Sequence, residues 1–240
     1  MKTYGFIVLG LFFIICSCSS DDNLQTNNTE DEDPTEETDS SIRYLALGDS
    51  YTIGEGVDQL ERWPNQLVDV LESNDITVES SEIIAQTGWT TSNLINAIDA
   101  NDPQDFNLVS LLIGVNNQFA NQDFDLFITE FNVLIQRSNL IAGSSDRVFV
   151  VSIPDYGVTP FANSWGNPEQ IASELDMYND YMRQRCVGLG IPFIDITEIS
   201  RTLGDSDGAL ASDNLHPSGE QYRLWVEEIL PVVLEMVSDQ

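Results

Sequence analysis

The stretch that decides the fold runs Ile42-Arg43-Tyr44-Leu45-Ala46-Leu47-Gly48-Asp49-Ser50. Its apolar run ends abruptly in glycine and polar residues, which is typical of a buried strand that gives way to a loop. In parallel α/β sheets, active sites collect outside the carboxyl ends of the strands. We therefore expect the hydroxyl of Ser50 to lie at such an edge, where a base within reach would make it a nucleophile.

Apolar runs and amphipathic segments alternate along the rest of the chain. Strands are expected at Ile42–Leu47, within Ile76–Ala85, and at Leu108–Ile113, Arg147–Ile153 and Ile191–Ile194. Helices are expected after Trp63-Pro64, from Thr90 or Thr91 through Ile98, around Phe124–Ile135, over Ile171–Leu189, and after Pro217, with Ser218 and Gln221 as a capping box. This alternation predicts a parallel sheet covered on both faces. Right-handed crossovers would then bring the loops that hold Ser50, Gly88 and Asn116 to one edge.

A single histidine, His216, stands in Asp213-Asn214-Leu215-His216-Pro217. A serine hydroxyl needs a base within hydrogen-bond reach before it attacks an ester, and His216 is the one imidazole in the chain. Asp213 lies three residues earlier, close enough in a turn to hold the other ring nitrogen and fix its tautomer. The sequence thus predicts Ser50, His216 and Asp213 as catalytic residues for acyl transfer to water. This chemistry needs no metal and no organic cofactor.

Four short blocks carry a family resemblance. They are Gly48-Asp49-Ser50, Gln86-Thr87-Gly88-Trp89-Thr90, Gly114-Val115-Asn116-Asn117 and Asp213-Asn214-Leu215-His216. In this order they resemble the blocks of the SGNH hydrolases, also called GDSL-type esterases, over roughly residues 42 to 238. The sequence departs from the family pattern at Asn117, because the third block usually ends in aspartate.

The resemblance implies both a fold and a set of oxyanion donors. The fold is a flavodoxin-like three-layer α/β/α sandwich with a central five-stranded parallel sheet in the order 2-1-3-4-5. The donors are the backbone N–H groups of Ser50 and Gly88 and the side-chain amide of Asn116. Loss of one such donor typically lowers kcat by about 10²–10³.

Composition bounds the remaining choices. The 240 residues, 42% of them hydrophobic, suffice for one core. A net charge of -31 disfavours binding to nucleic acid and to anionic membranes. Of the three cysteines only Cys186 lies outside the N-terminal region, so no disulfide can form within the domain, and we interpret Cys186 as a packing residue.

The N-terminal region predicts export. Residues 1–17 combine Lys2 with an apolar core too short for a comfortable membrane span, and Ile15-Cys16-Ser17-Cys18 resembles a bacterial lipobox. We expect a lipoprotein signal peptide over 1–17, lipidation of Cys18, an acidic disordered tether over 18–41 and a hydrolase domain over 42–240. The enzyme would then sit at the cell envelope, lipid-anchored to the outer membrane or cell surface. The alternative is an ordinary secretory signal cleaved nearby.

The sequence is compatible with two classes of substrate. Small acyl groups, such as acetyl esters on carbohydrate, and longer chains, as in lysophospholipids, are both compatible with the sequence. The loop Pro154–Pro168 is expected to wall a pocket. The aromatic residues that could stack on a sugar or wall an acyl channel are Trp63, Trp89, Tyr156, Phe161 and Trp165, although Trp63 could simply be core. A different class of function, a non-catalytic surface-binding lipoprotein on a retained hydrolase fold, is the competing hypothesis.

Overall fold

The computed structural model describes residues 41–238, apart from the side chain of Trp165. The predictions for the signal peptide, for Cys18 and for the tether up to residue 40 lie outside the described residues.

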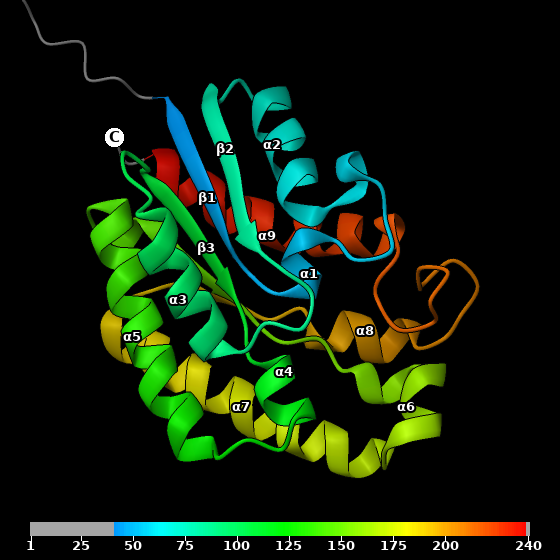
Figure 1. The fold of residues 1–240 in the computed structure, drawn as a ribbon. Helices are drawn as coiled ribbons and strands as arrows, with labels where there is room; N and C mark the ends of the chain where they lie inside the picture. The colour runs from blue at the N-terminus through cyan, green and yellow to red at the C-terminus, as the bar shows by residue number, and fades with distance from the viewer. Residues whose placement is uncertain (1–40, 239–240) are drawn as a thin grey trace, which may run out of the picture. The chain divides into compact units, whose positions relative to one another are not determined.

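A five-stranded sheet forms the centre of the domain (Figure 1). Its strands are β1 (Ile42–Gly48), β2 (Val78–Ala85), β3 (Leu108–Leu112), β4 (Val148–Val151) and β5 (Phe193–Ile194). They lie in the order β2-β1-β3-β4-β5, and every neighbouring pair is parallel. The predicted fold class and strand order are therefore confirmed. All carboxyl ends of the strands point to one edge, and the segments that follow β1, β2 and β3 meet there.

Helices cover the sheet on both faces. The α-helices are α1 (Ser50–Ile53), α2 (Trp63–Ser73), α3 (Thr91–Asn101), α4 (Val115–Phe119), α5 (Phe124–Ala142), α6 (Pro160–Trp165), α7 (Pro168–Leu189), α8 (Thr197–Leu203) and α9 (Gly219–Ser238). Single 3₁₀ turns occur at Gln59–Glu61, Ser145–Arg147 and Tyr156–Val158. Helices α2 and α9 pack against each other on one face, and α3, α5 and α7 form the layer on the other. These three layers form an α/β/α sandwich.

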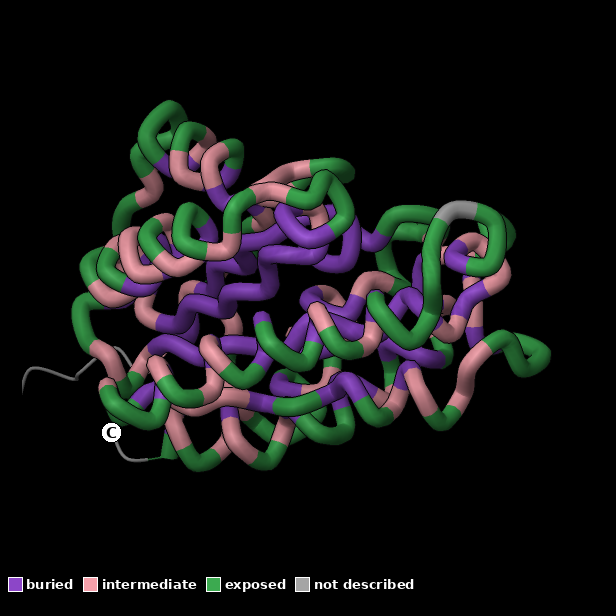
Figure 2. Tube along the Cα trace, turned by 90° about the horizontal axis from the view of Figure 1, so that it is seen from below, coloured by how far each residue is buried: buried purple, intermediate pink, exposed green. Residues whose placement is uncertain are grey.

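The core lies between the layers, where buried residues follow the strands and the inner sides of the helices (Figure 2). Every residue of β3 is buried, as expected for a central parallel strand with helices on both faces. Phe127 and Phe131 of α5 stack on each other, and Phe127 also packs on Tyr178 of α7. Each such fully buried side chain contributes roughly 1.5–3 kcal/mol to folding. Cys186 belongs to this core, so its interpretation as a packing residue agrees with its burial.

The structure corrects several local predictions. The segment Pro154–Pro168 is not a continuous loop, because the hydroxyl of Thr159 caps α6 and Pro160 occupies its first turn. Short helices α1 and α4 begin directly after β1 and β3, where we expected loops, and α8 was not expected. The capping box of α9 is half formed: the backbone N–H of Gln221 donates to Ser218, but the Gln221 side chain donates to the carbonyl of Ala209.

Within residues 41–238, no helix has both the length and the apolarity that a membrane crossing requires.

Candidate active site

Ser50 begins helix α1 at the carboxyl end of β1. Asp49 caps this helix, because its Oδ1 accepts a hydrogen bond from the backbone N–H of Tyr51 at 3.1 Å. The first N–H groups of a helix have no partner within the helix and point outward from its start. The backbone N–H of Ser50 therefore belongs to a set of donors at the start of α1.

Gly88 follows β2, and Asn116 lies in α4 after β3. The backbone of Gly88 has φ 85°, a left-handed conformation that side chains disfavour. The amide Nδ2 of Asn116 donates to the carbonyl of Trp89 at 2.9 Å. This bond ties Asn116 to the Gly88 loop and uses one of the two amide hydrogens, so the second remains for another acceptor.

His216 is held by Asp213 within one turn of chain. Its Nδ1 lies 2.6 Å from Asp213 Oδ2, and its backbone N–H donates to Asp213 Oδ1 at 3.0 Å. Partial burial acts to raise the pKa of Asp213, but the hydrogen bonds from His216 and from the N–H of Leu215 outweigh it and hold that pKa below its usual value. An ionised Asp213 keeps the proton of the neutral imidazole on Nδ1 and leaves Nε2 as an acceptor.

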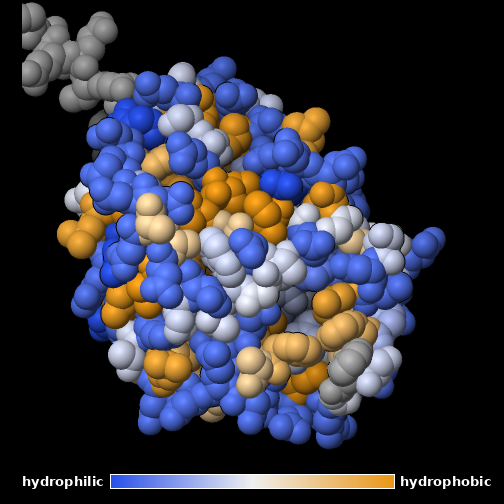
Figure 3. Space-filling model, viewed as in Figure 1, coloured by the Kyte–Doolittle hydropathy of each residue, from blue (hydrophilic) through white to orange (hydrophobic). Residues whose placement is uncertain are grey.

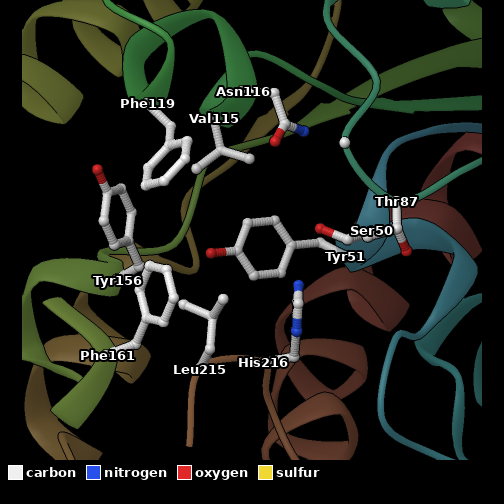
Figure 4. Close-up of a pocket in the computed structure, with 11 residues that line it drawn as sticks. Ser50, Tyr51, Thr87, Val115, Asn116, Phe119, Tyr156, Phe161, Leu215 and His216 are labelled. Carbon is white, nitrogen blue, oxygen red and sulfur yellow. The ribbon is translucent and has the colours of Figure 1, made fainter. Parts of the chain in front are cut away.

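These side chains meet at a cavity of about 140 Å³. Its polar side is formed by Ser50, Thr87, Gly88, Asn116 and His216, and its other walls by Tyr51, Val115, Phe119, Tyr156, Phe161 and Leu215. Figure 4 shows the ring of His216 directed toward the hydroxyl of Ser50, with Phe119, Tyr156 and Phe161 across the cavity from them. In Figure 3, apolar side chains show over α4 and α6, and further apolar areas show in the region of the sheet. The cavity thus combines a polar end with an apolar end.

Asp49 is fully buried beside this cavity, and its Oδ2 has no hydrogen-bond partner. Desolvation raises the pKa of Asp49 to about 7, even though the N–H groups of Tyr51 and Gly114 favour the charged form. Burial also raises the pKa of Tyr51 well above its usual value, and Asp49 adds to that shift.

The structure brings together most of the residues that the sequence predicts. Ser50, Gly88, Asn116 and His216 line one cavity, and Asp213 lies behind His216. Among the aromatic candidates, Tyr156 and Phe161 line it. Trp63 is fully buried, so its alternative interpretation as a core residue is right, and the partly buried Trp89 packs against the core outside the cavity.

Phe119 was missed by the sequence analysis. It lies one helical turn after Asn116, and this spacing places it on the same side of α4 once that helix is known.

The family model of the GDSL-like lipase/acylhydrolases matches residues 46–224. The chain belongs to this family. The matched span contains every residue at the cavity, and the chain is therefore a carboxylic-ester hydrolase. A search of curated proteins finds no match to this GDSL-like acylhydrolase.

Solved structures show the same fold. TesA superposes with a TM-score of 0.64 at 14% identity, over 81% of this chain and 99% of that one. The psychrotrophic esterase EstA from a Pseudoalteromonas species gives a TM-score of 0.63 at 16% identity, over 82% of this chain and 100% of the other. Phospholipase A1 from Streptomyces albidoflavus gives 0.56 at 21% identity, over 82% and 99%. At these identities the comparisons establish the fold of this acylhydrolase.

The arrangement offers acid–base chemistry at a hydroxyl. An imidazole with a free Nε2, a buried serine and several N–H donors face one space, which is what acyl transfer requires. Among residues 41–238, no group of three or more His, Cys, Asp or Glu side chains is arranged to hold a metal ion.

Proposed function

We propose that this acylhydrolase cleaves carboxylic esters through an acyl-enzyme on Ser50 and that it prefers short acyl groups. The observation that carries the proposal is the convergence of Ser50, His216, Gly88 and Asn116 on one cavity, with Asp213 bonded to His216. These residues come from four separate segments of the chain.

The reaction proceeds in two halves. Ser50 Oγ attacks the ester carbonyl carbon while its proton passes to His216 Nε2. His216 then returns that proton to the leaving alcohol as the carbon–oxygen bond breaks, which leaves the acyl group on Ser50. In the second half, water gives a proton to His216 and attacks the acyl-enzyme, and His216 protonates Ser50 Oγ as the acid departs. Asp213 stabilises the imidazolium in both halves.

Three N–H donors stabilise the negative oxygen of each tetrahedral intermediate. They are the backbone N–H of Ser50 at the start of α1, the backbone N–H of Gly88, and the second amide hydrogen of Asn116. The bond from Asn116 to the Trp89 carbonyl holds the amide before substrate binds. Donors that are already oriented require no reorganisation during the reaction.

The shape of the cavity supports a short acyl group. Its volume of about 140 Å³ is below the range of about 300–1,000 Å³ that is usual for ligand pockets. Phe119, Tyr156 and Phe161 form the walls opposite Ser50, so the acyl group and the alcohol part of the ester share this small space. We further propose that the enzyme acts at the cell envelope through a lipid on Cys18. Mass spectrometry of the mature N-terminus tests this anchor, and an unmodified N-terminus would refute it.

The test of catalysis compares 4-nitrophenyl esters from acetate to palmitate. Wild-type protein should turn over acetate and butyrate best, and Ser50→Ala should lose at least about 10³-fold in kcat. Ser73→Ala is the matched control, because Ser73 is an exposed serine on α2 whose hydroxyl bonds the carbonyl of Asp69. Equal activity of wild type and Ser50→Ala would refute the nucleophile, and a preference for palmitate would refute the short acyl group. Inactivity on all esters would favour a non-catalytic binding protein.

A further inference from the structure

A second cavity, of about 380 Å³, adjoins the catalytic cavity and shares Phe119 and Tyr156 with it. The two aromatic rings thus form a common wall. Figure 4 shows both on the side of the catalytic cavity away from Ser50, with the hydroxyl of Tyr156 directed away from the serine. The other polar side chains that line this second cavity are Gln118, Asn121, Asn167, Gln170 and Glu174.

A chain of hydrogen bonds organises these polar groups. Tyr156 donates from its hydroxyl to Gln118 Oε1 at 2.9 Å, and Gln118 Nε2 donates to Glu174 Oε2 at 2.7 Å. From the other side, Gln170 Nε2 donates to Glu174 Oε1 at 2.8 Å. Gln118 is itself only 8% exposed. Gln118 is therefore held by a partly buried network, and Gln170 extends that network to the exposed rim of the cavity.

The chemistry of this second cavity suits hydroxyl groups. A sugar hydroxyl donates and accepts at once, and amides and a carboxylate offer both partners. Phe119 is 51% exposed and presents an apolar ring beside these polar groups. A sugar ring has an apolar face and a polar rim, so this combination fits it. The carboxylate of Glu174 and the net charge of -31 oppose a phosphate or another anion.

We propose that the second cavity binds the carbohydrate part of the substrate, so that the enzyme removes short acyl groups from sugar hydroxyls. This inference rests on the proposed function, because it takes Ser50 as the attacking group. The acyl carbonyl lies at Ser50 and the acylated sugar lies against Phe119 and Tyr156. The next sugar unit enters the second cavity, whose volume falls within the usual range for ligand pockets of about 300–1,000 Å³.

The decisive experiment distinguishes recognition of the sugar from hydrolysis of the ester bond. Acetate release would be measured from acetylated xylotriose, cellotriose and chitotriose and, in parallel, from 4-nitrophenyl acetate. The double variant Asn121→Ala with Gln170→Ala should raise KM for at least one acetylated trisaccharide about tenfold. The same variant should leave kcat/KM for 4-nitrophenyl acetate within about twofold, since neither residue lines the catalytic cavity.

Gln104→Ala supplies the matched control. Gln104 is also an exposed glutamine whose amide bonds an acidic residue, Asp102, but it lines a different cavity beside α5. Its substitution should change neither substrate. The proposal is overturned if the double variant behaves like this control on all three trisaccharides, or if it impairs both substrate classes equally. It is also overturned if the double variant selectively impairs hydrolysis of lysophosphatidylcholine, because the cavity would then bind a lipid headgroup.

A binding measurement distinguishes failure of this inference from failure of the proposed function. Unacetylated xylotriose, cellotriose and chitotriose would be titrated calorimetrically into the Ser50→Ala protein with and without Gln170→Ala. Binding that Gln170→Ala weakens supports the subsite even if Ser50 proves not to be the nucleophile. Ser50-dependent cleavage of 4-nitrophenyl acetate without binding of any trisaccharide would retain the proposed function and overturn the subsite.

Discussion

Asn117 and Thr91 are joined by two hydrogen bonds that tie α4 to the start of α3. The Thr91 backbone N–H donates to Asn117 Oδ1 at 3.1 Å, and Asn117 Nδ2 donates to the Thr91 hydroxyl at 2.7 Å. The second hydrogen of that amide goes to Gln122 Oε1 at 3.0 Å. Asn117 is fully buried, it follows Asn116 directly, and its partner Thr91 lies three residues after Gly88. Asn117, the residue that departs from the family motif, therefore has its amide oxygen and both amide hydrogens bonded, and it connects two parts of the site.

The usual aspartate would not fit this network unchanged. The Thr91 hydroxyl donates its proton to Glu130, and Glu130 also accepts from Ser92. Asn117→Asp would set two carboxylates in competition for one hydroxyl proton and remove both donors of the amide. We expect the variant to lose about 1–3 kcal/mol of stability and about tenfold in kcat as Asn116 shifts.

Glu130→Gln should relieve that competition, because its amide can donate where the carboxylate only accepts. Thermal unfolding and kcat would be measured for Asn117→Asp, Glu130→Gln and the combination. The double variant should be more stable and more active than Asn117→Asp alone. If the losses of the two single variants simply add up in the double variant, the two carboxylates do not compete for the Thr91 proton.

The buried carboxyl of Asp49 should make stability depend on pH. Its pKa is about 7 in the folded protein, against an ordinary value of 3.8 for the solvated side chain, so between these values the folded state holds a proton that the unfolded state has lost. Stability then falls as pH rises, since it falls wherever the native state binds more protons. The effect is on the order of a few kcal/mol.

Asp49→Asn removes this titration and keeps the Oδ1 acceptor for Tyr51 N–H. Near pH 4 the variant and wild type should be similarly stable, because each then presents an uncharged group at the unpartnered Oδ2 position. By pH 8 the variant should be the more stable protein. Chemical unfolding of both across this range measures the difference, and a constant difference would show that Asp49 does not titrate there.

The parallel sheet and the meeting of the main candidate residues at one edge were predictable for physical reasons, whereas the strand order came from the family resemblance. A central parallel strand is buried on both faces, so β3 is an unbroken apolar run in the sequence, and polar loops mark where such strands end. With one histidine in the chain, the base for Ser50 had one candidate. The bond between His216 and Asp213 is local in sequence, so spacing alone indicated it.

The second cavity was not predictable in the same way. Its walls come from α4, the Tyr156 turn and α7, and its polar groups are joined across large sequence separations, as in the bond from Gln118 to Glu174. In the sequence, Gln170 and Glu174 have the spacing of the solvated side of a long amphipathic helix. Only the packing of α7 against α4 shows that they also line a cavity next to the catalytic one.

Arg201 holds the buried carboxylate of Asp155 next to the cavity residue Tyr156. Its Nε lies 2.9 Å from Asp155 Oδ2, and the Asp155 side chain is only 2% exposed. Arg201→Met should cost about 3–5 kcal/mol because it leaves a buried charge unpaired. Adding Asp155→Asn should recover much of this loss, since the amide oxygen still accepts from the N–H of Gly157.

Thermal unfolding and KM for 4-nitrophenyl butyrate would both be measured for these variants. Arg223→Met is the control, because Arg223 pairs with Glu220 and Glu227 on the exposed side of α9, and its loss should change the melting temperature little. If Arg201→Met is no less stable than this control, the Asp155 pair does not hold the Tyr156 turn.

Gly88 allows a test that separates backbone strain from catalysis. A methyl group added at Gly88 would meet no atom within 4 Å, but the backbone there has φ +85°, which alanine adopts at a cost of about 1–2 kcal/mol. Gly143, after the end of α5, has φ +77° and equally open surroundings, and it does not line the catalytic cavity. Alanine at either position should therefore lower stability by a similar amount.

Only Gly88→Ala should lower kcat, by about tenfold or more, with little change in KM, because relaxation of the strained backbone turns its N–H away from the oxyanion. Melting temperatures and kcat for the two variants check this, and equal kcat values at matched stability would remove Gly88 from the oxyanion donors.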